Sequence, residues 1–115
     1  MGTGPTNPGT KALIITLKRT ARKEKVALWK RIAEELARPT RQRREVNISK
    51  INQYAQEGEI ALIPGKVLGD GELTKNVKVA AYSFSQAAKA KIKSPLTIQE
   101  LLQQNPKGKN VRIIG

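Results

Sequence analysis

The stretch Gly58–Leu73, GEIALIPGKVLGDGEL, marks the point where the chain changes from helical to extended patterning. Its apolar run Ile60–Ile63 is short and is closed by Pro64–Gly65, which predicts a buried strand. Lys66–Leu68 predicts another short extended piece, ending at the turn Gly69–Gly71. The middle of the chain therefore consists of very short strands separated by glycine turns.

Further strands and helices follow this stretch. Ser85 is a candidate helix cap, and Thr97 and Glu100 have the spacing of a capping box. The elements predicted here are the strand Val77–Phe84, a helix over residues 86–93, a helix from Ile98 that ends before Asn105–Pro106, and the strand Val111–Ile114.

The residues before the stretch have helical periodicity. Residues 1–9 are rich in Gly, Pro and Thr and predict a flexible arm, after which Thr10 is a candidate N-cap. Apolar spacing predicts helices over residues 11–24 and 26–37, and Trp29 is expected in the core. A third helix is predicted over residues 48–56, with Asn47 as its cap and Gly58 as its exit.

This order of elements predicts an α/β or α+β domain with a basic helical layer at its N-terminal end. We expect a single domain over residues 10–115, preceded by the arm at residues 1–9. Its basic helical part covers residues 10–56, and its mixed strand and helix part covers residues 57–115.

The composition excludes several kinds of chemistry. The 115 residues contain no Cys and no His, so disulfides, thiolate nucleophiles and His-dependent catalytic triads are excluded. The longest apolar runs have four residues, against about twenty needed to span a bilayer. We expect a cytosolic protein with no metal, no cofactor, no membrane association and no small-molecule substrate.

Positive charge is the strongest functional signal. Twenty-two Lys and Arg face nine Asp and Glu, a net charge of +13, which predicts a nucleic-acid partner or, with less support, an anionic membrane surface. Seven of the eight Arg lie in the first 50 residues, and four of them fall between Arg38 and Arg44, within the predicted loop Arg38–Glu45. The candidate RNA-binding residues are Lys11, Lys18, Arg19, Arg22, Arg38, Arg41, Arg43, Arg44, Lys50 and Lys66.

An active site is not indicated. The Gly-rich stretch lacks the Walker A spacing, and no pair of carboxylates is placed for acid and base work. Tyr54, Tyr82 and Phe84 are interpreted as core or strand packing rather than as a base-stacking platform.

Several segments, taken in order, resemble a known family. They are the Arg-rich loop leading into Glu45–Asn47, Ile51–Ala55, Ile63–Leu73, Val79–Ala81 with Phe84–Ser85, and Asn105–Pro106 before Val111–Arg112. Together they resemble the archaeal and eukaryotic large-subunit ribosomal protein L-eighteen-e family, and Lys66–Leu73 is also similar to the bacterial relative L-fifteen. The resemblance covers about residues 8 to 114.

This resemblance implies a non-catalytic protein held against large-subunit ribosomal RNA and neighbouring large-subunit ribosomal proteins. The implied fold is α/β, a small layered domain described as an irregular superhelix of short strands and helices, preceded by N-terminal helices. On this hypothesis Arg41, Arg43 and Arg44 carry most of the RNA contact, and the other candidate cations assist.

Two other functions stay open at this point. A free-standing DNA- or RNA-binding regulator would need a helix-turn-helix around the Arg loop, which is longer than the usual turn of that motif. A small phosphoryl-transfer or nucleotide enzyme would have to use the glycines between residues 65 and 71.

Overall fold

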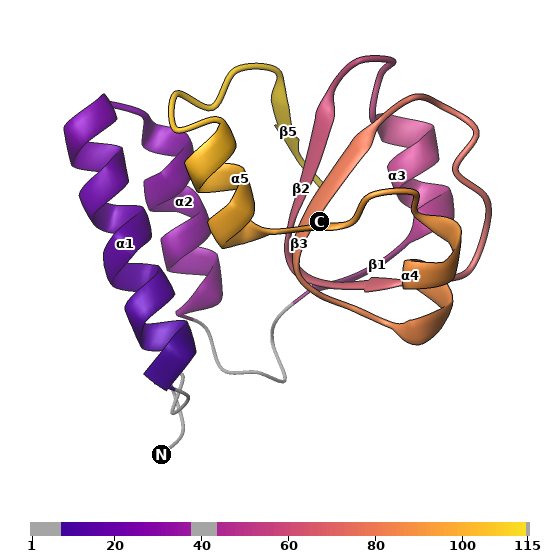
Figure 1. Ribbon diagram of the computed structural model, residues 1–115, viewed down its shortest axis with the longest axis horizontal. Helices are drawn as coiled ribbons and strands as arrows, with labels where there is room; N and C mark the ends of the chain where they lie inside the picture. The colour runs from indigo at the N-terminus through magenta and orange to yellow at the C-terminus, as the bar shows by residue number, and fades with distance from the viewer. Residues whose placement is uncertain (1–7, 38–43, 115) are drawn as a thin grey trace.

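The computed structural model describes residues 8–37 and 44–114, which form helices packed on both faces of one sheet (Figure 1). In chain order the elements are α1 (Pro8–Glu24), α2 (Ala27–Leu36), β1 (Arg44–Asn47), α3 (Ile48–Tyr54), β2 (Ile60–Leu68), β3 (Lys78–Phe84), α4 (Gln86–Lys91), β4 (Leu96–Thr97), α5 (Ile98–Gln104) and β5 (Val111–Ile113). The fold is therefore α/β with N-terminal helices, as the sequence predicts.

Strand β2 is the centre of a parallel sheet. Strand β3 follows one edge of β2 from Ile60 to Val67 and pairs with β4 on its far side. The other edge of β2 is divided, because β5 pairs with Ile60–Leu62 and β1 pairs with Gly65–Leu68. A single nine-residue strand thus holds the N-terminal and C-terminal parts of the domain together.

Alternation along the strands produces two cores, one on each face of the sheet. Leu62 and Ala80 face the layer formed by α1, α2 and α5, and Ile63 and Ala81 face the layer formed by α3 and α4 (Figure 1). Trp29 is fully buried in the first of these cores, which confirms its expected place.

The structure corrects two predictions, one of a loop and one of the end of a strand. The predicted Arg-rich loop extends to residues 44 and 45, but Arg44–Asn47 forms β1, because parallel pairing with the central strand supplies backbone partners that sequence patterning does not reveal. Pro64–Gly65 does not end the strand at Ile63 either, because β2 continues to Leu68. The pairing register with β3 shifts between Ile63 and Lys66, and such a bulge accommodates a proline that has no N–H to donate.

The cap predictions have mixed outcomes. Ser85 and the capping box of Thr97 with Glu100 are confirmed by their side-chain hydrogen bonds. Asn47 is the N-cap of α3, but its side chain accepts a hydrogen bond from the backbone N–H of Asp70 instead of one from the helix. Thr10 is not a cap, because α1 begins at Pro8.

Thr10 instead lies within the first turn of α1, where it is buried and its hydroxyl forms a hydrogen bond with the Tyr82 hydroxyl of β3. The expectation of core or strand packing holds for one tyrosine and fails for the other. Tyr82 does pack against the core under α1, whereas Tyr54 is 54% exposed at the end of α3, so the interpretation of Tyr54 is wrong.

Candidate nucleic-acid interface

The orientation of α1 determines which of its cations face solvent. Leu13, Ile14 and Leu17 are buried against α2 and α5. Full burial of such a side chain contributes about 1.5–3 kcal/mol to the free energy of folding. Because successive helical residues are separated by about 100°, this turns a neighbouring stripe of the helix outward. The exposed residues on this face are Lys11, Ile15, Lys18, Arg19 and Arg22, called the α1 cationic face below.

The α1 cationic face has no acidic counterpart within the described residues. No Asp or Glu of residues 8–37 or 44–114 forms an ion pair with Lys11, Lys18, Arg19 or Arg22. Ile15, 57% exposed, lies among these cations and gives the face an apolar spot. Such a face offers charge to a polyanion and an apolar contact to a sugar or base.

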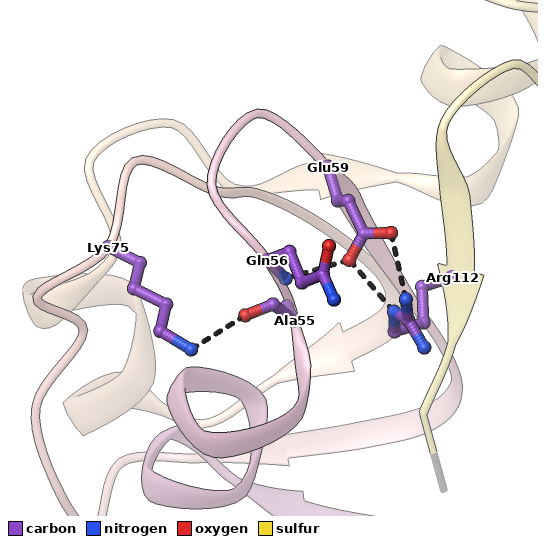
Figure 2. A network of polar contacts seen from close by, with 5 residues as sticks. All are labelled: Ala55, Gln56, Glu59, Lys75 and Arg112. Carbon is purple, nitrogen blue, oxygen red and sulfur yellow. Dashed lines mark hydrogen bonds and ion pairs between the residues drawn. The ribbon is translucent and has the colours of Figure 1, made fainter.

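Arg112, the arginine farthest along the chain, is used differently (Figure 2). Its Nε and Nη2 donate to the two carboxylate oxygens of Glu59 at 2.8 and 3.1 Å. The Gln56 backbone N–H donates to the same carboxylate at 2.7 Å, and Lys75 Nζ donates to the Ala55 carbonyl at 2.9 Å. These contacts attach two parts of the chain to the segment that joins α3 to β2. Arg112 attaches β5, and Lys75 attaches the residues that precede β3.

Hydrogen bonding explains the charge states of this pair. The side-chain hydrogen bonds from Arg112 and the backbone hydrogen bond from Gln56 lower the pKa of the Glu59 carboxyl, against a smaller opposing effect of burial. The same hydrogen bonds, donated by Arg112 to the Glu59 carboxylate, raise the pKa of Arg112. Arg112 therefore stays charged and is paired with a carboxylate within the fold, in contrast to the α1 cations.

The structure groups only some of the predicted RNA-binding residues. Lys11, Lys18, Arg19 and Arg22 lie together on α1, whereas Lys50 lies on α3 in the opposite helical layer. Lys66 is exposed on β2, in register with Glu45 and Ser83. Arg38, Arg41 and Arg43 lie outside the described residues, and Arg44 is described only as the first backbone position of β1.

Three exposed residues near this face are missing from the site predicted from the sequence. Ile15 has helical spacing from Lys11, Lys18 and Arg22, so this spacing could have placed it on the same face. Lys25 follows Arg22 by three residues and Lys18 by seven, so helical spacing already indicates the same stripe. Lys30 lies on α2, and only the angle between α1 and α2 brings it near Lys18 and Arg22.

The described ranges offer no metal site and no membrane span. Residues 8–37 and 44–114 contain no group of three or more acidic residues placed to hold a metal ion. None of the helices in these ranges is both long enough and apolar enough to cross a bilayer.

Comparison with known proteins identifies the family. The family described as ribosomal proteins 50S-L15, 50S-L18e and 60S-L27A matches residues 27–95, more than half of the chain. The chain belongs to this ribosomal protein family. The resemblance to L-eighteen-e and L-fifteen is thereby confirmed.

Individual relatives match nearly the whole chain. Large ribosomal subunit protein eL18 of Methanococcus maripaludis is 51% identical over 114 residues, covering 96% of this chain and 95% of its own. The proteins of the same name from Methanoregula boonei and Archaeoglobus fulgidus are 48% and 47% identical, covering 95% and 94% of this chain and 93% and 96% of their own. These matches therefore extend over α1, which precedes the residues matched by the family model.

Proposed function

We propose that this chain is a structural, non-catalytic component of the large ribosomal subunit in the cytoplasm and binds folded ribosomal RNA. The α1 cationic face is the observation that carries the RNA-binding role, because four exposed cations on one rigid helix have no carboxylate partner among the described residues. The ribosomal family of the chain supports the location.

The binding mechanism is electrostatic. Each Lys or Arg that contacts a phosphate releases condensed counterions, so affinity falls steeply as salt rises. The buried Leu13, Ile14 and Leu17 hold α1 against the core and so fix the spacing of its cations. The Arg-rich segment 38–44 adds further phosphate contacts. Lys50 on α3 and Lys66 on β2 add contacts from other parts of the domain, and neighbouring large-subunit proteins complete the environment.

The alternative of a helix-turn-helix regulator is not favoured by the geometry. That motif joins two helices by a turn of about three or four residues. Here α2 ends at Leu36 and α3 begins at Ile48, and strand β1 lies between them in the sheet. The two helices also belong to opposite layers of the sheet, so α3 is not placed against α2 as a recognition helix.

Sedimentation of a cell lysate tests this function. The chain is followed by antibody through sucrose gradients at low and high monovalent salt. We expect it to travel with the large subunit at low salt and to leave only at high salt. A chain that stays at the top of the gradient, or that follows chromosomal DNA, contradicts the proposed function.

A further inference from the structure

A groove lies at the turn between α1 and α2, next to the α1 cationic face. Its volume is about 630 Å³, within the range of small-ligand sites. Ala21, Val26 and Ala27 provide apolar lining, and the remaining lining residues are Lys18, Arg22, Lys25 and Lys30. All four of these cations are exposed, and no acidic residue lines the groove.

The backbone at this turn favours glycine, yet the residue there is a lysine. Lys25 has a φ of +57°, in the left-handed region, and the N–H of Val26 donates to the Ala21 carbonyl at 3.1 Å. This bond closes the helix in a Schellman motif, whose left-handed position is usually occupied by glycine. Lys25 therefore carries backbone strain while placing a charge on the rim of the groove.

We propose that this groove binds an unpaired nucleotide of RNA, with the face of the base on the apolar lining and its flanking phosphates on the four cations. The charge of the rim selects a polyanion. The floor distinguishes an unpaired nucleotide from a duplex, because the paired backbone presents only charged and polar groups to a surface, whereas an unstacked base has an apolar face to bury.

This site rests on the RNA-binding role proposed above and names the form of RNA that it takes. Two variants test the two parts of the groove separately, the four cations that form its rim and the three apolar residues that form its floor. Lys25→Gly removes one rim charge and relieves the left-handed strain, and Ala27→Leu fills the floor without changing the charge. Lys93→Gly is the matched control, because Lys93 is an exposed lysine that does not line the groove.

The experiment measures the affinity of the full chain by fluorescence anisotropy with three RNA probes. They are a short unstructured oligonucleotide, its duplex, and deproteinised large-subunit ribosomal RNA. We expect Lys25→Gly to weaken single-strand binding severalfold and to lower its salt slope by about 0.7, with a melting temperature at least as high as that of the wild type. We expect Ala27→Leu to weaken binding of the single strand and not of the duplex, and Lys93→Gly to change neither.

Three results would overturn the proposal. One is ribosomal RNA binding by the wild type with no effect of Lys25→Gly or Ala27→Leu, which leaves the proposed function intact. Another is equal loss of duplex and single-strand binding in Ala27→Leu, which indicates contacts to the backbone alone. The third comes from competition with polyglutamate. If polyglutamate displaces RNA from the wild type but not from Ala27→Leu, the groove binds an acidic protein. If the wild type binds none of the three RNA probes, the proposed function itself fails.

Discussion

The indole Nε1 of Trp29 donates a hydrogen bond to the carbonyl oxygen of Pro106 at 2.7 Å. Trp29 lies on α2 and is fully buried, and Pro106 lies in the segment between α5 and β5. The bond therefore ties the N-terminal helical layer to the segment that leads into the last strand, across 77 positions of the chain.

Trp29→Phe is expected to destabilise the domain by about 2 kcal/mol, because it leaves the Pro106 carbonyl without its donor and opens space in a buried core. Urea unfolding measures this change. Tyr54→Phe is the control, because Tyr54 is 54% exposed and should change stability by less than about 0.5 kcal/mol. Equal midpoints for wild type and Trp29→Phe would contradict the role of this bond.

Gly71→Ala is expected to destabilise the fold more than Gly58→Ala. Both glycines have a positive φ, +103° and +84°, so both substitutions strain the backbone by about 1–3 kcal/mol. Only at Gly71 would the added Cβ also meet Ser49, at 2.5 Å from its Cβ and 2.7 Å from its backbone N, whereas nothing lies within 4 Å at Gly58. Thermal unfolding of both variants measures the difference, and equal destabilisation would show that the close approach to Ser49 is unimportant.

Glu59→Gln is expected to reduce stability at neutral pH and to lose this effect in acid. The pKa of Glu59 is lowered in the fold, chiefly by the hydrogen bonds from Arg112, so the ionised carboxylate stabilises the folded state above the ordinary pKa of a glutamate. That contribution disappears as the pH falls through the lowered pKa.

Urea midpoints of wild type and Glu59→Gln over a pH series check this prediction. Glu72→Gln is the matched control, because the Glu72 side chain is 77% exposed and its contact with Lys91 is 3.7 Å long. A difference between wild type and Glu59→Gln that stays constant with pH would contradict an ionic role for Glu59.

Local signals predict the helices well, and tertiary pairing explains what they miss. Thr97 and Glu100 close a capping box from neighbouring residues alone, so spacing is enough to find α5. Strand β1 exists because it pairs with Gly65–Leu68, about twenty residues away, and its four residues have no period of their own. Pro64 wrongly predicts the end of a strand, because the register shift that lets β2 continue past it cannot be read from the sequence.

The candidate site shows the same division. Helical spacing places Lys11, Lys18 and Arg22 on one face of α1 without any tertiary information. The groove beside them depends on the angle between α1 and α2, which follows from how Trp29 and Leu17 pack, and no local pattern specifies that angle.

The triple variant Arg41→Ser, Arg43→Ser and Arg44→Ser is expected to weaken incorporation into the large subunit while unfolding stays cooperative. Replacing three guanidinium groups removes bidentate phosphate binding. The pairing of Arg44 with Gly65 in the sheet uses the backbone, which serine also supplies. Sedimentation of tagged chains from cells measures incorporation, and urea unfolding checks the fold. Unaltered incorporation would count against a role of the Arg-rich segment in RNA binding.

The salt dependence of binding to deproteinised large-subunit ribosomal RNA tests whether the α1 cationic face binds phosphates. One variant changes Lys11, Lys18, Arg19 and Arg22 to Gln. The control changes Lys78, Lys89, Lys93 and Lys109, four exposed lysines outside α1 and α2, to Gln and so removes the same charge.

If the α1 cationic face binds phosphates, the slope of log affinity against log salt falls by about one for each phosphate that is no longer bound, and only in the α1 variant. Both proteins should keep the wild-type stability to within about 0.5 kcal/mol, because all eight side chains are at the surface. Equal slopes for the two variants would mean that net charge alone drives binding, and would contradict phosphate binding by the α1 cationic face.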